Sequence, residues 1–283
     1  MRYIVGVSRA VLRTQCLDAP GLIATVTGAC MRAGFNIVSN SEHVDRERGE
    51  FCMRTVLEGE GDMRSFEALV REALPAGAVV TCSVPRPLRV VIMVTREAHC
   101  LGDLLVRWFE GAVPVDIAGV VGNHDDLRGL VERFDLPFHY VSHEGVSRQE
   151  HEREVGKIVD GYTPDLVVLA KYMRVLSPEF VARYPERMLN IHHSFLPAFV
   201  GARPYAQAFA RGVKIIGATA HFVTDDLDEG PIVTQDVIPV GQDWSAKEMA
   251  FGGRDVEKIV LARAISLVAQ GRVFVTGNRT VVL

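Results

Sequence analysis

The chain has 283 residues, a length typical of about two domains with a sizeable core. Hydrophobic residues make up 48% and charged residues 23%, and the formal net charge is -4, which argues against a disordered chain, a fibrous protein and a general nucleic-acid binder. No apolar run approaches the roughly 18 residues of a membrane span, and residues 1–9 do not fit a signal peptide. We therefore expect a cytoplasmic protein that binds neither nucleic acid nor membrane.

The first third of the chain alternates between strand and helix patterns. The β-prone residues 10–17 lead into Asp18-Ala19-Pro20-Gly21, a turn and helix start with Asp18 near the N-cap. Apolar residues at helical spacing then predict a helix over 22–33. Strands are expected at 35–45 and 50–57, a helix at 63–74 and a strand at 78–84. The predicted order is βαββαβ.

This order, with Asp18-x-Pro20-Gly21 entering the first helix, resembles the ACT domain, a small ferredoxin-like module. The resemblance covers about residues 8–84 and implies an amino-acid site between copies of the module, near Asp18 and Gly21. A ferredoxin-like unit that serves only for contacts between copies is the alternative, because a fold does not determine a function.

Pro85-Arg86-Pro87 forms a stiff break after this module, because each proline restricts itself and its predecessor. We place the domain boundary there. The expected divisions are a regulatory domain at 1–84, a linker at 85–87 and a catalytic domain at 88–283.

Cysteine usage gives no sign of a disulfide or metal framework. No pair has C-x-x-C spacing and the total is odd, so we expect reduced thiols, mostly buried. The five cysteines all lie in the first hundred residues, at Cys16, Cys30, Cys52, Cys82 and Cys100.

Beyond the linker, strands alternate with helices, the pattern of a mostly parallel sheet covered on both faces. We expect a Rossmann-like α/β domain. The predicted strands are 88–95, 116–121, 137–141, 166–170, 188–191, 215–223 and 232–240, with a last pair around Gly277-Asn278. The predicted helices are 100–109, 126–134, 147–161, 177–184 and 247–269.

The loop after the first strand of this domain, residues 96–103, contains no Gly-x-Gly-x-x-Gly. A dinucleotide, or a phosphate held by a glycine-rich turn, therefore has no support in the sequence. His99 in this loop could line a site or could cap the following helix.

The segment 188–197, Met-Leu-Asn-Ile-His-His-Ser-Phe-Leu-Pro, lies at the carboxyl end of a predicted strand, where ligands bind in open α/β sheets. Strand alternation puts Asn190 and His192 on one face and Ile191 and His193 on the other. An amide and an imidazole can both donate to one substrate oxygen. Taken alone, the motif also fits a polar strand end with a packed histidine.

A third group comes from the acidic turn at 224–231. Such turns are normally solvated, but Asp228 lies just before Gly230-Pro231, where the backbone is constrained. Asn190 and a protonated His192 could donate to an oxyanion, while Asp228 holds the imidazole as the cation and relays protons through a water. The three groups together suit transfer or hydrolysis of a formyl group.

Several ordered segments together resemble the formyltransferase fold and, more narrowly, the formyltetrahydrofolate deformylase family. The resemblance covers nearly the whole chain, the ACT-like module included. The segments are 99–105, 172–180, 190–197, 201–205, 217–221 and 227–231.

The resemblance implies hydrolysis of 10-formyltetrahydrofolate to formate and tetrahydrofolate without a metal or other cofactor, in a homo-oligomer that balances one-carbon folate pools for purine synthesis. It implies a catalytic trio of Asn190, His192 and Asp228, and glycine and methionine as effectors. Arg174 is a natural partner for the folate's glutamate carboxylate, with a surface ion pair as the alternative. The implied folate pocket comprises Met173, Arg174, Val175, Leu176 and Asp225.

Two positions bear on the choice between hydrolase and transferase. Glycinamide ribonucleotide transformylases carry proline after the catalytic histidine and a glycine-rich loop after the first strand, where this chain has His193 and the segment 96–103. We therefore expect water as the acceptor, and we expect His193 to face away from the site. Ala206 stands where the deformylase pattern has histidine, which leaves any role of that side chain open.

Two other functions stay open at this point. One is formyl transfer to an amine, such as a nucleotide sugar or glycinamide ribonucleotide, and the other is a non-catalytic sensor of folate and amino acids. Transfer to initiator tRNA is disfavoured, because no basic RNA-binding appendage follows the folate domain.

Overall fold

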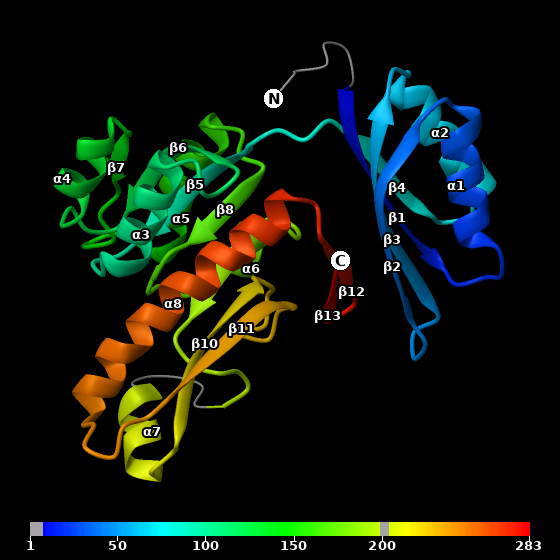
Figure 1. Ribbon diagram of the computed structural model, residues 1–283. Helices are drawn as coiled ribbons and strands as arrows, with labels where there is room; N and C mark the ends of the chain where they lie inside the picture. The colour runs from blue at the N-terminus through cyan, green and yellow to red at the C-terminus, as the bar shows by residue number, and fades with distance from the viewer. Residues whose placement is uncertain (1–7, 199–203) are drawn as a thin grey trace. The chain divides into compact units, whose positions relative to one another are not determined.

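The computed structural model describes residues 8–198 and 204–283, which form two compact units (Figure 1). Unit 1 runs up to Arg86 and also includes the C-terminal segments Gln270–Thr276 and Thr280–Leu283. Unit 2 comprises Pro87–Ala269 and Gly277–Arg279. Among the described helices, none combines the length with the hydropathy that a membrane crossing requires.

Unit 1 is a four-stranded antiparallel sheet with two helices packed on one face (Figure 1). Its core joins Leu12 and Met53 of the sheet to Val26 and Phe66 of the helices. The strands, in the order β2-β3-β1-β4, are β1 (Ser8–Leu17), β2 (Asn36–Asp45), β3 (Glu50–Gly59) and β4 (Val79–Ser83). The helices are α1 (Leu22–Arg32) and α2 (Met63–Ala73). This confirms the βαββαβ order predicted from the sequence.

Asp18 lies near the N-cap of α1, as predicted, but does not itself cap the helix. The N-cap is Gly21, whose φ of 89° is a left-handed conformation that glycine adopts readily, and it supplies no side-chain cap. Asp18 follows the end of β1, and its backbone N–H donates to the Gly49 carbonyl over 2.7 Å. The Pro20-Gly21 turn therefore separates Asp18 from the helix.

Most of the C-terminal hairpin of β12 (Val273–Thr276) and β13 (Arg279–Val282) belongs to unit 1. Arg13 Nη2 donates to the Val273 carbonyl over 2.6 Å, and Gln15 Nε2 donates to the Val275 carbonyl over 2.8 Å. The Arg13 guanidinium also lies 4.5 Å from the centre of the Phe274 ring. This differs from the assignment of all of 88–283 to the catalytic domain.

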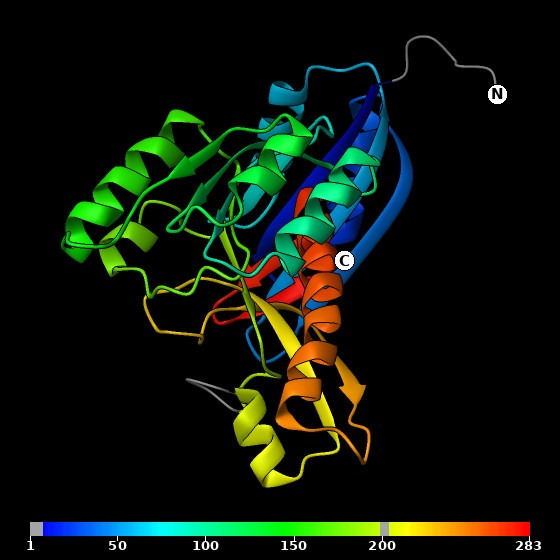
Figure 2. The ribbon, with the colours of Figure 1, turned by 90° about the vertical axis from the view of Figure 1, so that its left-hand side faces the viewer.

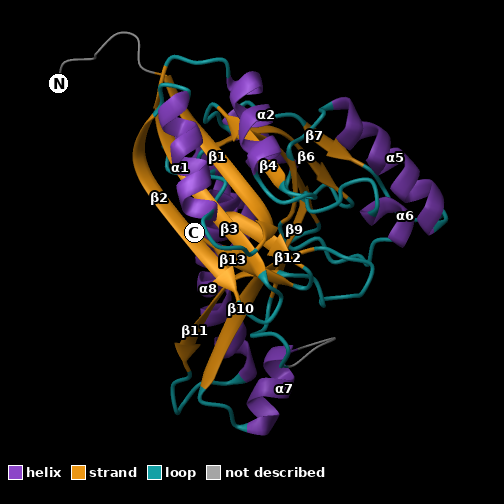
Figure 3. Cartoon of the chain, turned by 90° about the vertical axis from the view of Figure 1, so that its right-hand side faces the viewer, coloured by secondary structure: helices purple, strands orange, loops and turns teal. Residues whose placement is uncertain are grey.

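Unit 2 is built on a seven-stranded sheet in the order β11-β10-β9-β8-β5-β6-β7. Five strands are parallel, and β10 and β11 add an antiparallel edge (Figure 3). The strands are β5 (Leu88–Val94), β6 (Val115–Gly122), β7 (Phe138–Tyr140), β8 (Leu166–Leu169), β9 (Met188–His192), β10 (Ile215–Phe222) and β11 (Ile232–Pro239). The prediction of a mostly parallel α/β sheet is confirmed.

Helices cover both faces of this sheet, α3 and α8 on one face and α5 on the other (Figure 2). Val155 and Val159 of α5 pack against Val91, Val167 and Met188 of the strands. The longer helices are α3 (His99–Phe109), α5 (Arg148–Gly161) and α8 (Ala246–Ala269). Both faces of the parallel strands β5 to β9 are covered, so their sequences are apolar runs rather than alternating patterns.

The short helices differ most from the predictions. The segment 126–134 forms only α4 (Arg128–Val131) and the 3₁₀ turn η1 (Glu132–Phe134). The segment 177–184 forms only α6 (Pro178–Val181). Ser177 caps α6 as expected, because its side chain accepts a hydrogen bond from the Phe180 N–H. Helix α7 (Pro204–Arg211) was not predicted. Ala206 is exposed on α7, and residues 201–203 of the adjoining motif lie outside the described residues.

Candidate active site

A cavity of 290 Å³ opens at the carboxyl ends of β8 and β9, beside the loop between β10 and β11. All of the predicted catalytic and folate-contacting residues line it. The lining residues are Leu169, Lys171–Leu176, Val181, Asn190–His193, His221 and Val223–Asp228. The structure therefore brings together Asn190, Asp228 and the 173–176 segment, which lie far apart in the sequence.

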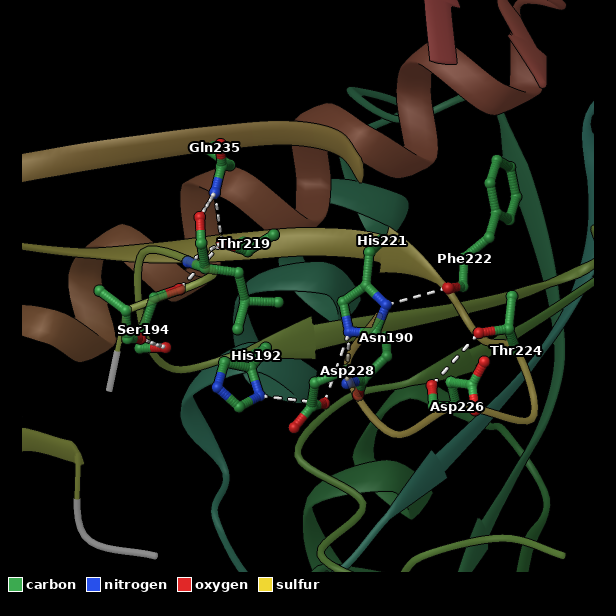
Figure 4. A network of polar contacts seen from close by, with 12 residues as sticks. Asn190, His192, Ser194, Thr219, His221, Phe222, Thr224, Asp226, Asp228 and Gln235 are labelled. Carbon is green, nitrogen blue, oxygen red and sulfur yellow. Dashed lines mark hydrogen bonds and ion pairs between the residues drawn. The ribbon is translucent and has the colours of Figure 1, made fainter. Parts of the chain in front are cut away.

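Asn190 is held by a histidine from the neighbouring strand. Antiparallel pairing of β9 with β10 puts Asn190 directly opposite His221, so their side chains share one face of the sheet. Asn190 Nδ2 lies 3.2 Å from His221 Nε2, and His221 Nδ1 donates to the Phe222 carbonyl over 2.9 Å (Figure 4). Because an amide nitrogen only donates, His221 Nε2 accepts one hydrogen of Asn190, and the second hydrogen is left for a substrate.

His192 and Asp228 form a direct pair. His192 Nδ1 lies 3.1 Å from Asp228 Oδ1, and the two side chains are 7% and 12% exposed (Figure 4). His192 Nε2 is buried and has no hydrogen-bond partner among the described residues. Since a carboxylate only accepts, Nδ1 carries a hydrogen and the opposite nitrogen is the one that can meet a substrate.

Asp228 is ionised and shared between two rings. Its Oδ1 also lies 3.7 Å from His221 Nε2. Burial alone would raise the pKa of this carboxyl group, but its interactions with His192 and His221 outweigh burial and lower the pKa well below its usual range. A carboxylate in this position keeps a hydrogen on His192 Nδ1.

The loop that carries Asp228 is held in an unusual backbone conformation. Asp228 has a φ of 59°, in the left-handed region. Two residues later, a Cβ atom on Gly230 would lie 1.8 Å from the Phe222 carbonyl oxygen, so only glycine fits. The Phe222 N–H donates to the Pro231 carbonyl over 2.9 Å, which joins the loop to the end of β10.

A second cluster of buried polar groups borders the cavity. The Glu257 carboxylate, 1% exposed, accepts from His99 Nε2 over 2.7 Å and lies 3.2 Å from Lys171 Nζ. Tyr205 Oη donates to its other oxygen over 2.8 Å. Burial favours the neutral acid, but the His99 hydrogen bond and the Lys171 charge lower the pKa of Glu257 to about 2. Glu257 is therefore an anion paired with the Lys171 ammonium.

His193 lines the same cavity as His192, so the prediction that it faces away was wrong. The two ring centroids are 5.2 Å apart. Strand alternation does not apply, because β9 ends at His192 and His193 begins the following turn. Burial and the Lys171 charge lower the pKa of His193 to about 4, so its ring is neutral near pH 7.

The expected folate residues form the open side of the cavity. Met173 and Val175 are 56% and 57% exposed, and Leu227 opposite them is 58% exposed. The Met173 N–H donates to Thr95 Oγ1 over 2.9 Å, which ties this segment to the residue after β5. Arg174, Asp225 and Asp226 line the same space, so charged side chains of both signs accompany the apolar ones.

Three groups at the site escaped the sequence reasoning: His221, Lys171 and Glu257. His221 had a signal, because it lies in the motif 217–221 on a predicted strand. Glu257 had none, because a single acid on an amphipathic helix is normally solvated. The expected effector residues lie elsewhere, in unit 1, where Asp18 and Gly21 are both exposed.

Comparisons with known proteins agree with this geometry. The Formyl transferase family matches residues 88–265, and the ACT domain family matches residues 10–74. A formyltetrahydrofolate deformylase from Escherichia coli (strain K12) is 58% identical over 97% of this chain and 98% of the relative. One from Bacillus subtilis (strain 168) is 40% identical over 96% of this chain and 92% of the relative.

Solved structures extend this likeness to three dimensions. The crystal structure of a formyltetrahydrofolate deformylase from Pseudomonas syringae pv. tomato is 41% identical, with a TM-score of 0.92 over 99% of this chain and 96% of that one. Glycinamide ribonucleotide transformylase 1 from Symbiobacterium toebii has a TM-score of 0.67 and 32% identity over 70% of this chain and 94% of that one. The chain therefore belongs to the formyl transferase family and, within it, to the formyltetrahydrofolate deformylases.

Proposed function

We propose that this protein hydrolyses 10-formyltetrahydrofolate to formate and tetrahydrofolate. The observation that carries the proposal is the His192–Asp228 pair, which shares a cavity with Asn190 and with the exposed apolar residues Met173 and Val175. The activity is the one named for relatives that are 58% identical over 97% of the chain.

Hydrolysis of a formamide passes through a tetrahedral intermediate with negative charge on the former carbonyl oxygen. The water oxygen forms a bond to the formyl carbon, and the C=O π pair moves to oxygen. The free hydrogen of Asn190 Nδ2 and a hydrogen on His192 Nε2 are the donors to this oxygen, and the Asp228 carboxylate stabilises the imidazolium that donates. When the C–N bond breaks, the folate nitrogen takes the proton that the attacking water gives up. Formic acid leaves with the other hydrogen of that water and then loses it to solvent as formate is formed.

The folate binds along the rim of the cavity in this proposal. The apolar side chains of Met173, Val175 and Leu176 contact the flat aromatic parts of the ligand, and Asp225 lies on the facing loop. Arg174 pairs with the glutamate carboxylate, since a guanidinium can donate two parallel hydrogen bonds to a carboxylate.

The decisive test is formate release by the purified protein from 10-formyltetrahydrofolate in the absence of any amine. We expect turnover, and we expect Asn190→Ala to lower kcat by about 10²–10³-fold because one oxyanion donor is removed. Binding of unformylated folate by the variant, measured by calorimetry, should change little. Turnover only after an amine acceptor is added would support the transferase alternative. Full activity of Asn190→Ala would contradict the site assignment.

The reaction needs no metal or other cofactor in this proposal. Among the described residues, His99, Cys100 and Glu257 have potential ligand atoms within 4.8 Å of one another. The Lys171 ammonium already lies 3.2 Å from Glu257 and would repel a cation. Dialysis against a chelator should therefore leave the rate of formate release unchanged, and loss of the rate with recovery on adding a divalent metal would contradict this.

Unit 1 acts as the regulatory module in this proposal, with an amino acid bound near Asp18 and Gly21 between copies in a homo-oligomer. The match to the ACT domain family supports it, as does the place of β2 at the edge of the four-stranded sheet that the described residues form. Glycine and methionine are the effectors to add to the formate assay, alongside sedimentation to measure the size of the assembly.

We place the enzyme in the cytoplasm, where it supplies formate and balances one-carbon folate pools for purine synthesis.

A further inference from the structure

His193 lines the cavity but has no part in the mechanism above. Its ring centroid lies 5.2 Å from that of His192 and 6.1 Å from that of Tyr205. It is therefore close enough to the reacting groups to contact a small molecule bound beside them.

The backbone of the residues that follow His193 in the chain is anchored by the side chains of Thr219 and Gln235 (Figure 4). Thr219 Oγ1 donates to the Ser194 carbonyl over 2.9 Å and accepts from the Leu196 N–H over 3.1 Å. Gln235 Nε2 lies 2.8 Å from the same hydroxyl. The chain is therefore fixed on both sides of His193, by β9 before it and by this network after it.

The buried ion pair beside His193 has no obvious structural purpose. Burying a lysine and a glutamate is expensive, and apolar residues of similar volume often stabilise a protein equally well. Lys171 also has a φ of 62°, a strained backbone conformation for a lysine. Gly253 on α8 leaves room for the Tyr205 that donates to Glu257, because a Cβ there would lie 2.0 Å from Tyr205 Oη. The buried ion pair, the left-handed backbone and the Tyr205 contact together hold the Lys171 ammonium group in place.

The charges that face His193 come from four elements. Lys171, in the loop after β8, and His192 on β9 disfavour a protonated ring, as does burial. Glu257 on α8 and Asp228 in the loop after β10 favour it. Burial and Lys171 prevail, and the pKa of His193 falls to about 4. A neutral imidazole has one nitrogen that accepts a hydrogen bond, which an imidazolium lacks.

We propose that His193 holds the attacking water by accepting a hydrogen bond from it, and that Lys171, held by Glu257, is the positioning residue that keeps this acceptor available. The inference rests on the proposed hydrolase function and deepens it. His192 and Asn190 donate hydrogen bonds to the formyl oxygen, and His193 accepts one from the attacking water. Adjacent histidines in the chain therefore contact the electrophile and the nucleophile of the same reaction. In this arrangement His193 is the specificity element that makes water the acceptor.

Kinetics test the role of the ring. We expect His193→Ala to lower kcat about 10²-fold, in the range for positioned groups at a reacting proton, while KM for 10-formyltetrahydrofolate changes little. His193→Asn or His193→Gln, whose amide oxygens replace one or other ring nitrogen as acceptor, should turn over at least about tenfold faster than the alanine variant. His124→Ala, a half-buried histidine away from the cavity lining, is the matched control and should keep the wild-type rate.

Nuclear magnetic resonance of protein labelled at histidine ring carbons tests the role of Lys171. The signal missing from His193→Asn identifies His193, and it should show no titration from pH 8 down to pH 5. Lys171→Met should move its titration upward into this window, because the like charge is removed, and Lys171→Arg should not. Lys171→Met should also lower kcat more at pH 6 than at pH 8.

Two results would overturn the inference. One is a wild-type kcat in His193→Ala with the fold intact, and the other is a His193 signal in the wild-type protein that titrates at the usual histidine value. Both differ from failure of the proposed function, in which the wild-type protein itself releases no formate. The titration of the wild-type protein decides the question even where a variant does not fold.

Discussion

Asp228→Asn should lower kcat by about 10³-fold or more, the size of effect seen when the acid that orients a catalytic histidine is replaced by its amide. The variant has no negative charge to stabilise protonated His192, whose Nδ1 lies 3.1 Å from the carboxylate. Asparagine is the right replacement, because it tolerates the left-handed backbone at this position, where φ is 59°. Formate release measures the rate, and calorimetry with unformylated folate measures whether the pocket survives.

Glu229→Gln provides the control for Asp228→Asn. Glu229 lies in the same loop, is exposed and does not line the cavity, so removal of its charge should leave kcat unchanged. If kcat fell equally in both variants, the effect would come from the total charge of the loop and not from the contact of Asp228 with His192. A normal rate in Asp228→Asn would remove Asp228 from the site and leave His192 without its proposed partner.

Gly230→Ala should reduce both stability and activity. The added Cβ would lie 1.8 Å from the Phe222 carbonyl oxygen, a contact that no small shift relieves. That carbonyl also accepts from His221 Nδ1 over 2.9 Å, so its displacement moves the ring that holds Asn190 and faces Asp228. Overpacking of this kind destabilises by about 1–3 kcal/mol or more, which corresponds to a fall in Tm of roughly 2–12 °C.

Thermal unfolding and formate release measured on the same sample test this prediction. Gly129→Ala in α4 is the matched control, because a Cβ there meets nothing within 4 Å. It should keep the wild-type rate and a Tm at or slightly above the wild-type value, since alanine favours a helix more than glycine does. Wild-type behaviour of Gly230→Ala would mean that the loop carrying Asp228 adapts freely, contrary to the tight crossing at Phe222.

Most of the fold was predictable because its signals are local. The apolar runs at 88–95 and 166–170 predict strands covered on both faces, and β5 and β8 are such strands. The short helices were not predictable to the same extent. Residues 126–134 have helical spacing, but only Arg128–Val131 is α-helical, and the turn ends at Asp135 with a φ of 57°.

The trio of Asn190, His192 and Asp228 could be proposed from the sequence, because two of its members lie two residues apart on one strand and the third lies in a short constrained loop. The residues around the trio could not be assigned to the site from the sequence. His193 was expected on the far side of a strand that in fact ends one residue earlier. Strand alternation predicts a side chain's direction only while the strand continues.

The sequence by itself determined the two kinds of unit, the order of their elements, and the residues that can stabilise an oxyanion. These follow from hydrophobic periodicity and from chemistry carried on single segments. Only the tertiary structure decided what surrounds those residues. Glu257 meets His99 across 158 positions of the chain, and Val273 meets Arg13 across 260. Such contacts depend on how whole helices and strands pack, so no local pattern records them. The pairing of Lys171 with Glu257 beside His193 is one of them.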